Sequence, residues 1–212
     1  MSLAVRIRPT TAHDLSSIPA RFQRVIIHAS GPTTVAVDNA ASSTTASASA
    51  TSSTSNANKK QVFAFDQVHS PETSQYELFS TTAAPLITRF VEGFNCTILA
   101  YGQTSSGKTH SMTGVDLDAD PTDPSNGMGI IPRAVSTIFS RANELKRERG
   151  NAWQWSIKAS FIELYNEDLI DLLAVDDVSG RREVQIREEK DGTILWSGLR
   201  EIPVRSAADV MA

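Results

Sequence analysis

The sequence contains a single cysteine, Cys96, in 212 residues, so it can form no internal disulfide. It also lacks a long hydrophobic run, since the longest, around Ile98 to Tyr101, is far too short to cross a bilayer. The N-terminal stretch MSLAVRIRP has no basic flank followed by a long apolar block, as a secretory signal requires. These absences predict an intracellular protein of a reducing compartment with no membrane partner.

An excess of positive charge is absent too. The formal net charge of -4 argues against bulk nucleic-acid binding, which depends on neutralising phosphates. Hydrophobic residues make up 40% and charged residues 21%, as in an ordinary globular chain with one core. An acidic partner would therefore have to be met by a local basic patch.

Residues 40–58 contain no charged, aromatic or β-branched aliphatic residue, so they are predicted to be a disordered loop. The stretches on either side, TTVAVD and QVFAFDQV, have the Val- and Phe-rich pattern of strands. Because loop length costs closure entropy only logarithmically, the insertion is predicted to connect two strands of one sheet and not to divide two domains.

A helix is predicted from Ser70, the expected cap, with Pro71 in its first turn, a kink or split at Pro85 and an end at Gly93. The expected apolar stripe of this helix consists of Tyr76, Phe79, Ala83, Ile87 and Phe90. The run CTILAYG follows and is predicted to be a strand buried on both faces.

A second helix is predicted from about Ile131, and its apolar face is predicted to consist of Ile131, Val135, Ile138 and Phe139. SIKASFIELY is predicted to be a strand, and NEDLIDLL a short helix that Asn166 opens. EVQIREEKDGTILWSG is predicted to be a hairpin with a type I′ turn at Asp191-Gly192. The alternation of helices and strands predicts an α/β layered fold.

Two acidic stretches mimic other sites. In LIDLLAVDDVSG, the helical stripe argues against a strand with a Walker B aspartate and against a D-x-x-G switch at Asp177 to Gly180. Asp116, Asp118 and Asp120 resemble the start of a calcium loop, but Pro121 stands where that loop needs glycine. A solvated acidic loop is the favoured interpretation of the second stretch.

One segment matches the pattern G-x-x-x-x-G-K-[ST] without a mismatch. Its residues are Gly102, Gln103, Thr104, Ser105, Ser106, Gly107, Lys108 and Thr109. Such a loop points backbone N–H groups at a phosphate, while Lys108 suits the β- and γ-phosphates and the Thr109 hydroxyl suits Mg²⁺. The alternative is a glycine-rich turn that matches by chance, and the apolar run before the loop favours the phosphate site.

The sequence says less about the base. It has no N-K-x-D motif for guanine, whereas RIRP, Arg6 to Pro9, and His110 are groups that stack on a purine. An arginine in a first strand can equally be a solvated charge, so the residues alone leave both interpretations open.

Together, AYGQTSSGKTHSMTG, RIRP, FAFDQV and SFIELYNEDLIDLL resemble, in order and spacing, the N-terminal part of a kinesin motor domain over nearly the whole chain. The resemblance implies a P-loop NTPase-type α/β fold with a central mixed β-sheet flanked by helices. It also implies an ATP-driven, microtubule-stimulated motor of the cytoskeleton. APLITRFVEGFNCTILAYGQT and IREEKDGTILWSGLREIPV favour the chromokinesin-like branch.

The same resemblance implies the roles of particular residues. The segment from Gly102 to Thr109 would bind the phosphates of ATP, with Mg²⁺ at Thr109, and the last hairpin would face β-tubulin. The residues implied to flank adenine are Arg6, Arg8, Pro9 and His110.

Two kinesin motifs, N-x-x-S-S-R-x-H and D-x-A-G-x-E, do not occur here, so no catalytic residue is identified. We therefore expect residues 1–212 to be the N-terminal portion of a motor domain with an incomplete sheet, poorly folded and inactive alone, and dimeric only through regions outside it. The alternative functions are another P-loop NTPase or a non-catalytic tubulin-binding fragment.

Overall fold

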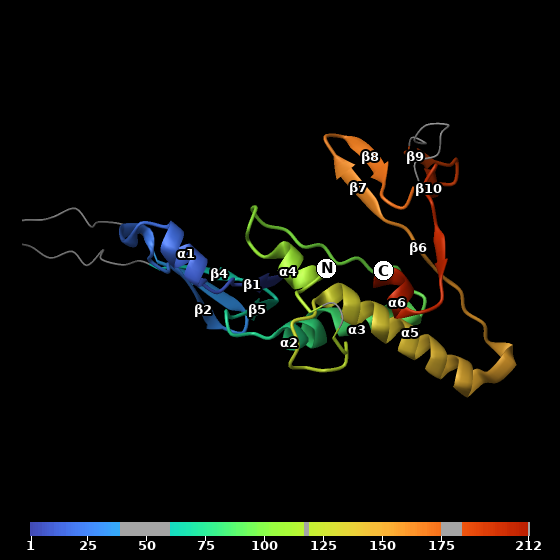
Figure 1. Ribbon diagram of the computed structural model, residues 1–212, viewed down its shortest axis with the longest axis horizontal. Coiled ribbons are helices and arrows are strands. Elements are labelled where there is room, and N and C mark those ends of the chain that lie inside the picture. Colours follow the sequence, from blue (N-terminus) through green and yellow to red (C-terminus); the bar gives the residue numbers. More distant parts are fainter. Residues whose placement is uncertain (39–59, 117–118, 175–183, 212) are drawn as a thin grey trace, which may run out of the picture. The chain divides into compact units, whose positions relative to one another are not determined.

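The computed structural model describes residues 1–38, 60–116, 119–174 and 184–211. It divides into two compact units, Met1–Arg133 and Ala134–Ala212, which are described separately (Figure 1). The predicted disorder of residues 40–58 and the alternative switch motif at Asp177 to Gly180 lie outside the described residues.

The first unit combines short strands with a long helical run. In chain order its elements are β1 (Ala4–Arg6), α1 (Ala12–Ser17), η1 (Ala20–Phe22), β2 (Ile27–Gly31), β3 (Thr34–Val37), β4 (Gln61–Ala64), β5 (Gln67–His69), α2 (Gln75–Leu78), η2 (Phe79–Ala83), α3 (Ala84–Val91) and α4 (Lys108–Met112). Helix α5 (Ile130–Arg149) starts at its end.

Two small sheets organise the N-terminal strands. β1 runs parallel to β5, and β2, β3 and β4 form an antiparallel meander. Val37 of β3 lies opposite Gln61 of β4. The insertion therefore connects two neighbouring strands of one sheet, as the sequence predicts.

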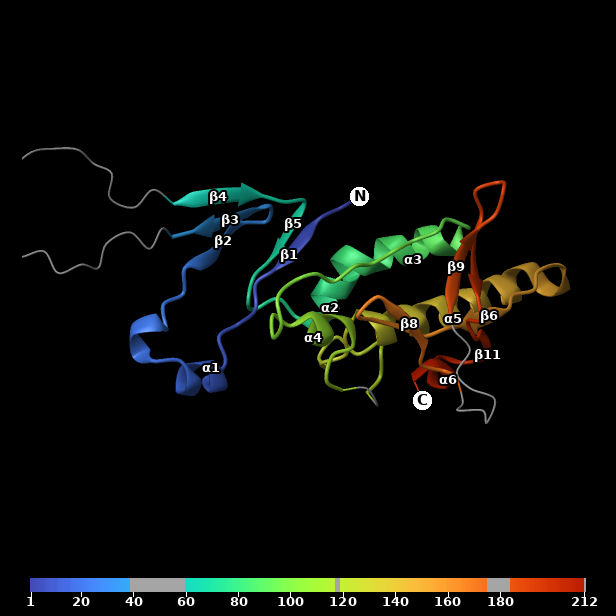
Figure 2. The same ribbon diagram turned by 90° about the horizontal axis from the view of Figure 1, so that it is seen from above.

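The predicted first helix is a continuous run of α2, η2 and α3 (Figure 2). It begins after Ser74, not after Ser70, because the Ser74 hydroxyl accepts a hydrogen bond from the backbone N–H of Glu77. Gly93 ends it as predicted, with a φ of 101° that favours glycine.

A π-helical segment, η2, lies just before Pro85. Pro85 has no N–H, so it cannot donate a hydrogen bond to the carbonyl oxygen of Thr81, four residues earlier. The side-chain amide of Gln67 donates to that oxygen instead, at 3.2 Å. The π-turn also rotates the residues before it relative to those after it. Phe79, Ala83 and Ile87 are buried as predicted.

The ends of the predicted stripe are wrong, since Tyr76 and Phe90 are 40% and 47% exposed. The stripe assumed one uniform helical period, which the π-turn interrupts.

The predicted strand CTILAYG is also wrong: it has no strand conformation, and Leu99 and Tyr101 are 84% and 96% exposed. A strand buried on both faces needs neighbours, and none of the described strands pairs with this segment.

Arg133 fixes the loop that precedes α5. This side chain is only 1% exposed, and its guanidinium donates hydrogen bonds to the backbone oxygens of Met128, Pro121 and Asp123 at 3.2, 2.6 and 3.1 Å. It also lies 5.4 Å from the centre of the Tyr76 ring. Burial lowers the pKa of Arg133, although Asp123 acts in the opposite direction. The acidic loop is thus held by a buried cation, a feature that the sequence pattern does not reveal.

The second helix is confirmed, because α5 begins at Ile130, but its predicted apolar face is only partly right. Phe139 is buried, whereas Ile131 is 39% exposed. Arg133 takes a buried position on the first turn of α5. The predicted face contained apolar residues only, so it did not include this charged residue. Phe139 packs edge to face on Trp155, with ring centres 5.7 Å apart.

The second unit consists of short antiparallel pairs. Its elements after α5 are η3 (Gly150–Ala152), β6 (Ile157–Ala159), β7 (Ile162–Tyr165), β8 (Asp168–Asp171), β9 (Gln185–Glu188), β10 (Ile194–Ser197), β11 (Ile202–Val204) and α6 (Ala207–Met211). The strand predicted at SIKASFIELY is confirmed but divided, since β6 pairs with β11 and β7 with β8.

The predicted helix at NEDLIDLL is wrong. Its residues from Asp168 to Asp171 form β8, which pairs with β7 in a two-residue hairpin. Asn166 and Glu167 have φ values of 48° and 74°, as a type I′ turn requires at both central positions. Asn166 therefore supplies a left-handed turn residue and not a helix cap.

The hairpin of β9 and β10 is confirmed, but its turn is not type I′. Gly192 has a φ of 83° and its N–H donates to the carbonyl of Glu189 at 2.9 Å, while Asp191 does not have a positive φ. A type I turn followed by a left-handed glycine gives a three-residue loop.

Among the described residues, no helix combines the length and apolarity needed to cross a membrane.

Two backbone segments touch at Gly129, and this contact generates a prediction. A Cβ on Gly129 would lie 2.6 Å from the carbonyl carbon and oxygen of Met112. We expect Gly129→Ala to lower the free energy of unfolding by roughly 3 kcal/mol, because backbone atoms cannot move aside. Urea unfolding followed by circular dichroism measures this change.

The control is Gly31→Ala, where the added Cβ meets a rotatable hydroxyl, Thr34 Oγ1, at 3.0 Å. We expect it to cost less than about 1 kcal/mol. Equal losses in the two variants would contradict the close approach at Gly129.

Candidate functional site

The loop from Gly102 to Thr109 turns directly into helix α4. Ser105 and Gly107 have φ values of 64° and 98°, and Gly107 is the residue that caps the helix. A Cβ on Gly102 would lie 2.6 Å from the Ser106 hydroxyl. The backbone of this loop therefore takes a tight path that needs glycine at Gly102 and Gly107, as the motif predicts.

Lys108 reaches back over its own loop. Its ammonium group donates hydrogen bonds of 2.8 Å to each of the carbonyl oxygens of Gly102 and Gln103. An ammonium group has three N–H donors, so one remains for an anion at the loop. The positive charge is thus held beside the backbone turn that the motif assigns to phosphate.

Thr109 follows Lys108 in the first turn of α4 and is exposed. A hydroxyl oxygen is a ligand type that Mg²⁺ accepts alongside water and phosphate oxygens. The donor set of this loop, one ammonium and one exposed hydroxyl after a glycine-rich turn, fits a nucleotide with its magnesium ion.

Arg6 and His110, far apart in the sequence, are joined through Gln75. Arg6 Nη1 donates to Gln75 Oε1 at 2.8 Å and to Ser111 Oγ at 3.0 Å. Gln75 Nε2 donates to the backbone oxygen of His110 at 2.6 Å. The structure therefore brings together two of the residues that the sequence assigns to the base.

Burial lowers the pKa values of Arg6 and His110, and the charge of Arg6 lowers that of His110 further. Arg6 remains charged, because an arginine does not lose its proton in proteins. His110 is held neutral to a lower pH than an ordinary histidine. The pair thus offers one cation and one neutral ring.

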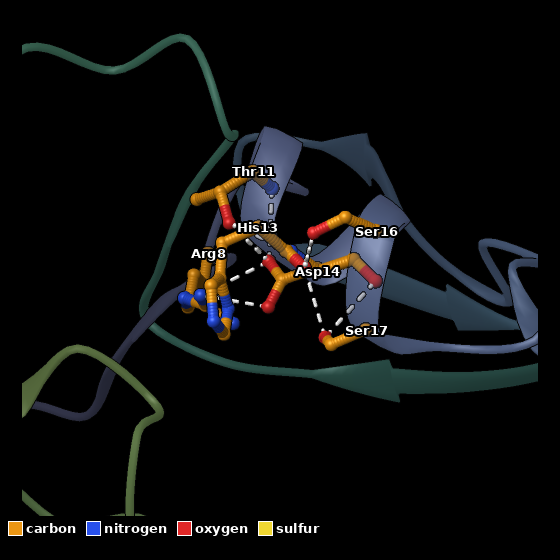
Figure 3. Close-up of polar contacts among 6 residues, drawn as sticks. All are labelled: Arg8, Thr11, His13, Asp14, Ser16 and Ser17. Atoms are coloured by element: carbon orange, nitrogen blue, oxygen red, sulfur yellow. Dashed lines mark hydrogen bonds and ion pairs between the residues drawn. The ribbon is translucent and has the colours of Figure 1, made fainter.

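Arg8 has a different environment (Figure 3). Its guanidinium forms an ion pair with Asp14 at 3.0 Å, and Asp14 also accepts hydrogen bonds from the backbone N–H and the hydroxyl of Thr11. Thr11 and Asp14 together form a capping box at the start of α1. Pro9 is exposed and lies on the stretch of chain between β1 and α1.

Comparison with known proteins now identifies the family. A family model described as the kinesin motor domain matches residues 6–212. The chain belongs to the kinesin motor domain family. This confirms the resemblance that the four sequence motifs indicate.

The chain is 40% identical over 153 residues to the kinesin-like protein Klp61F of Drosophila melanogaster, covering 70% of this chain and 13% of that protein. It is also 40% identical over 152 residues to the chromosome-associated kinesin KIF4 of Gallus gallus, covering 72% of this chain and 12% of that protein. The likeness to KIF4 agrees with the chromokinesin-like resemblance, and Klp61F is as similar.

Among solved structures, the chain is similar to a fast kinesin, whose structure is described as having implications for ATPase mechanism and interactions with microtubules. The TM-score is 0.74 at 28% identity, and the match covers 100% of this chain and 50% of that chain. This similarity confirms the predicted α/β fold class of the P-loop NTPase type.

Sequence reasoning missed Gln75 and Ser111. Gln75 is a polar residue in the first turn of a helix, where nothing local signals a buried position. Ser111 follows His110 in a run of small polar residues. Only the folded arrangement, which sets α2 against α4, shows that both contact Arg6.

The contacts of Asp14 with Thr11 and Arg8 generate a prediction about the pKa of Asp14. The backbone N–H and then the hydroxyl of Thr11 lower the pKa of Asp14 from 3.8 to about 2, with a further contribution from Arg8. We expect Thr11→Val to raise this pKa toward 3.8 and Arg8→Met to raise it less, as measured by carboxyl-carbon NMR.

Because the ionised carboxylate is the favoured form, its contribution to stability is fully present above pH 3.8 and is lost as the pH falls through about 2. A pKa unchanged by Thr11→Val would show that the Thr11 hydroxyl does not lower it, because the backbone N–H of residue 11 remains in this variant.

Proposed function

We propose that the complete protein is an ATP-dependent microtubule motor of the cytoskeleton, and that this chain is the N-terminal part of its motor domain. The chain spans 13% and 12% of two curated relatives and 50% of the fast-kinesin chain, so the activity is proposed for the whole protein. The loop around Lys108 is the observation that carries the proposal.

Three features support ATP as the ligand. The loop ends in a helix that Gly107 caps, and the Lys108 ammonium is held 2.8 Å from the loop carbonyls with a donor to spare. The Thr109 hydroxyl is exposed for Mg²⁺. Arg6 and His110 meet at Gln75, where a cation and a flat ring suit a purine.

In this arrangement each residue has a separate task. Lys108 would neutralise phosphate charge, and the loop N–H groups would orient the phosphates. Thr109 would hold Mg²⁺, which screens the phosphate oxygens when bound. Arg6 and His110 would contact the base. The resemblance assigns Arg8 and Pro9 to the base as well, and Arg8 is paired with Asp14 in this structure.

A binding measurement tests the nucleotide site. We expect the complete protein to bind a fluorescent ATP analogue in the presence of Mg²⁺, and Lys108→Ala to weaken binding at least roughly tenfold, because a hydrogen bond to a charged group contributes about 1.5–3 kcal/mol. Fluorescence titration gives the dissociation constants.

Lys158→Ala is the control, since Lys158 forms an exposed ion pair with Glu201 at 3.0 Å. It should bind the analogue as the unchanged chain does. Unaltered binding by Lys108→Ala, with both variants melting alike, would contradict a phosphate role for the loop.

A second measurement tests the motor assignment. We expect microtubules to accelerate phosphate release from ATP by the complete protein, and Lys108→Ala to abolish the acceleration. A preference for GTP, or turnover that tubulin leaves unchanged, would instead indicate another P-loop NTPase. Microtubule cosedimentation without any nucleotide turnover would indicate a tubulin-binding protein that does not catalyse.

A further inference from the structure

The side-chain amide of Gln75 occupies an unusual position for a polar group. Gln75 is only 7% exposed, although it stands in the first turn of α2, one residue after the Ser74 cap. A buried amide must have its hydrogen bonds satisfied, since an unpaired polar group costs about 1–3 kcal/mol. Here its partners come from three other segments of the first unit.

The orientation of this amide follows from its partners. Arg6 can only donate hydrogen bonds, so the oxygen of the amide must face Arg6, at 2.8 Å from Nη1. The nitrogen then faces the backbone oxygen of His110, which can only accept, at 2.6 Å. Rotating the amide by half a turn would place donor against donor on one side and acceptor against acceptor on the other.

The amide nitrogen also lies 3.3 Å from His110 Nδ1 and 3.4 Å from the backbone oxygen of Gly127. The two N–H groups of the amide thus have three acceptors within reach, two of them on His110. Gln75 therefore holds His110 through both its backbone oxygen and its ring.

We propose that Gln75 is a positioning residue, which holds Arg6 and His110 together at the purine subsite. This inference rests on the proposed nucleotide function. Gln75 acts through its hydrogen bonds with Arg6 and His110 and not through a contact of its own with the nucleotide. Its loss should therefore reduce recognition of the base and spare recognition of the phosphates.

The experiment compares ATP with inorganic tripolyphosphate, each with Mg²⁺, by calorimetry on the complete protein. We expect Gln75→Leu, which keeps an apolar side chain of similar size, to weaken ATP binding roughly tenfold, the size of one lost base contact. Tripolyphosphate binding should change less than about twofold, because the Lys108 loop is intact. Equal weakening of both ligands, or of neither, would overturn the proposal.

Gln67→Leu is the matched control. Gln67 also uses its amide within the first unit, where it donates to the Thr81 oxygen at 3.2 Å and accepts from Thr82 Oγ1 at 3.2 Å. These two contacts of Gln67 are with η2, whereas Gln75 lies in α2. The variant should keep the wild-type preference for ATP over tripolyphosphate, and a loss equal to that of Gln75→Leu would assign the effect to general loosening.

The two proposals fail in different ways. If Lys108→Ala binds ATP normally, the nucleotide function is wrong, whatever Gln75 does. If Lys108→Ala loses ATP while Gln75→Leu keeps the full preference for ATP over tripolyphosphate, the nucleotide function stands and the role of Gln75 is wrong.

Discussion

The amide of Gln75 joins parts of the chain that are distant in sequence, and the candidate site depends on it. It bonds to Arg6, 69 positions earlier, and to His110, 35 positions later. Because an amide satisfies a donor-only group and an acceptor-only group at once, it links strand β1 to helix α4, beside the direct hydrogen bond from Arg6 to Ser111. Arg133 acts in a similar way on the loop before α5. In a chain whose sheets are small, buried polar side chains carry much of the tertiary organisation.

Local signals in the sequence are the ones that the structure bears out. The spacing of Gly102, Gly107 and Lys108 predicts the loop and its turn into a helix, because a left-handed backbone and a helix start depend on a few adjacent residues. Gly93 ends a helix for the same reason. The strands on either side of the insertion are likewise short, regular patterns.

The errors arise where tertiary contacts or single-residue geometry decide. Asn166 is suited both to a helix cap and to a left-handed turn, and only the pairing of β7 with β8 selects the turn. Gln75 and Arg133 look like surface residues in the sequence, yet both are buried: Gln75 contacts partners far along the chain, and Arg133 contacts the loop just before it. Leu99 and Tyr101 belong to an apolar run that predicts a buried strand, but burial requires neighbouring strands, which no local pattern supplies.

The pairing of Val37 with Gln61 also fixes what the insertion can change. Both ends of the inserted segment are held by adjacent strands of one antiparallel ladder, so the distance between them is set by the sheet and not by the segment. The length and sequence of the segment can therefore vary without moving the ends of the two strands. The same geometry makes this junction a natural graft point, where a fluorescent domain with closely spaced termini could replace the insertion and leave the ladder intact.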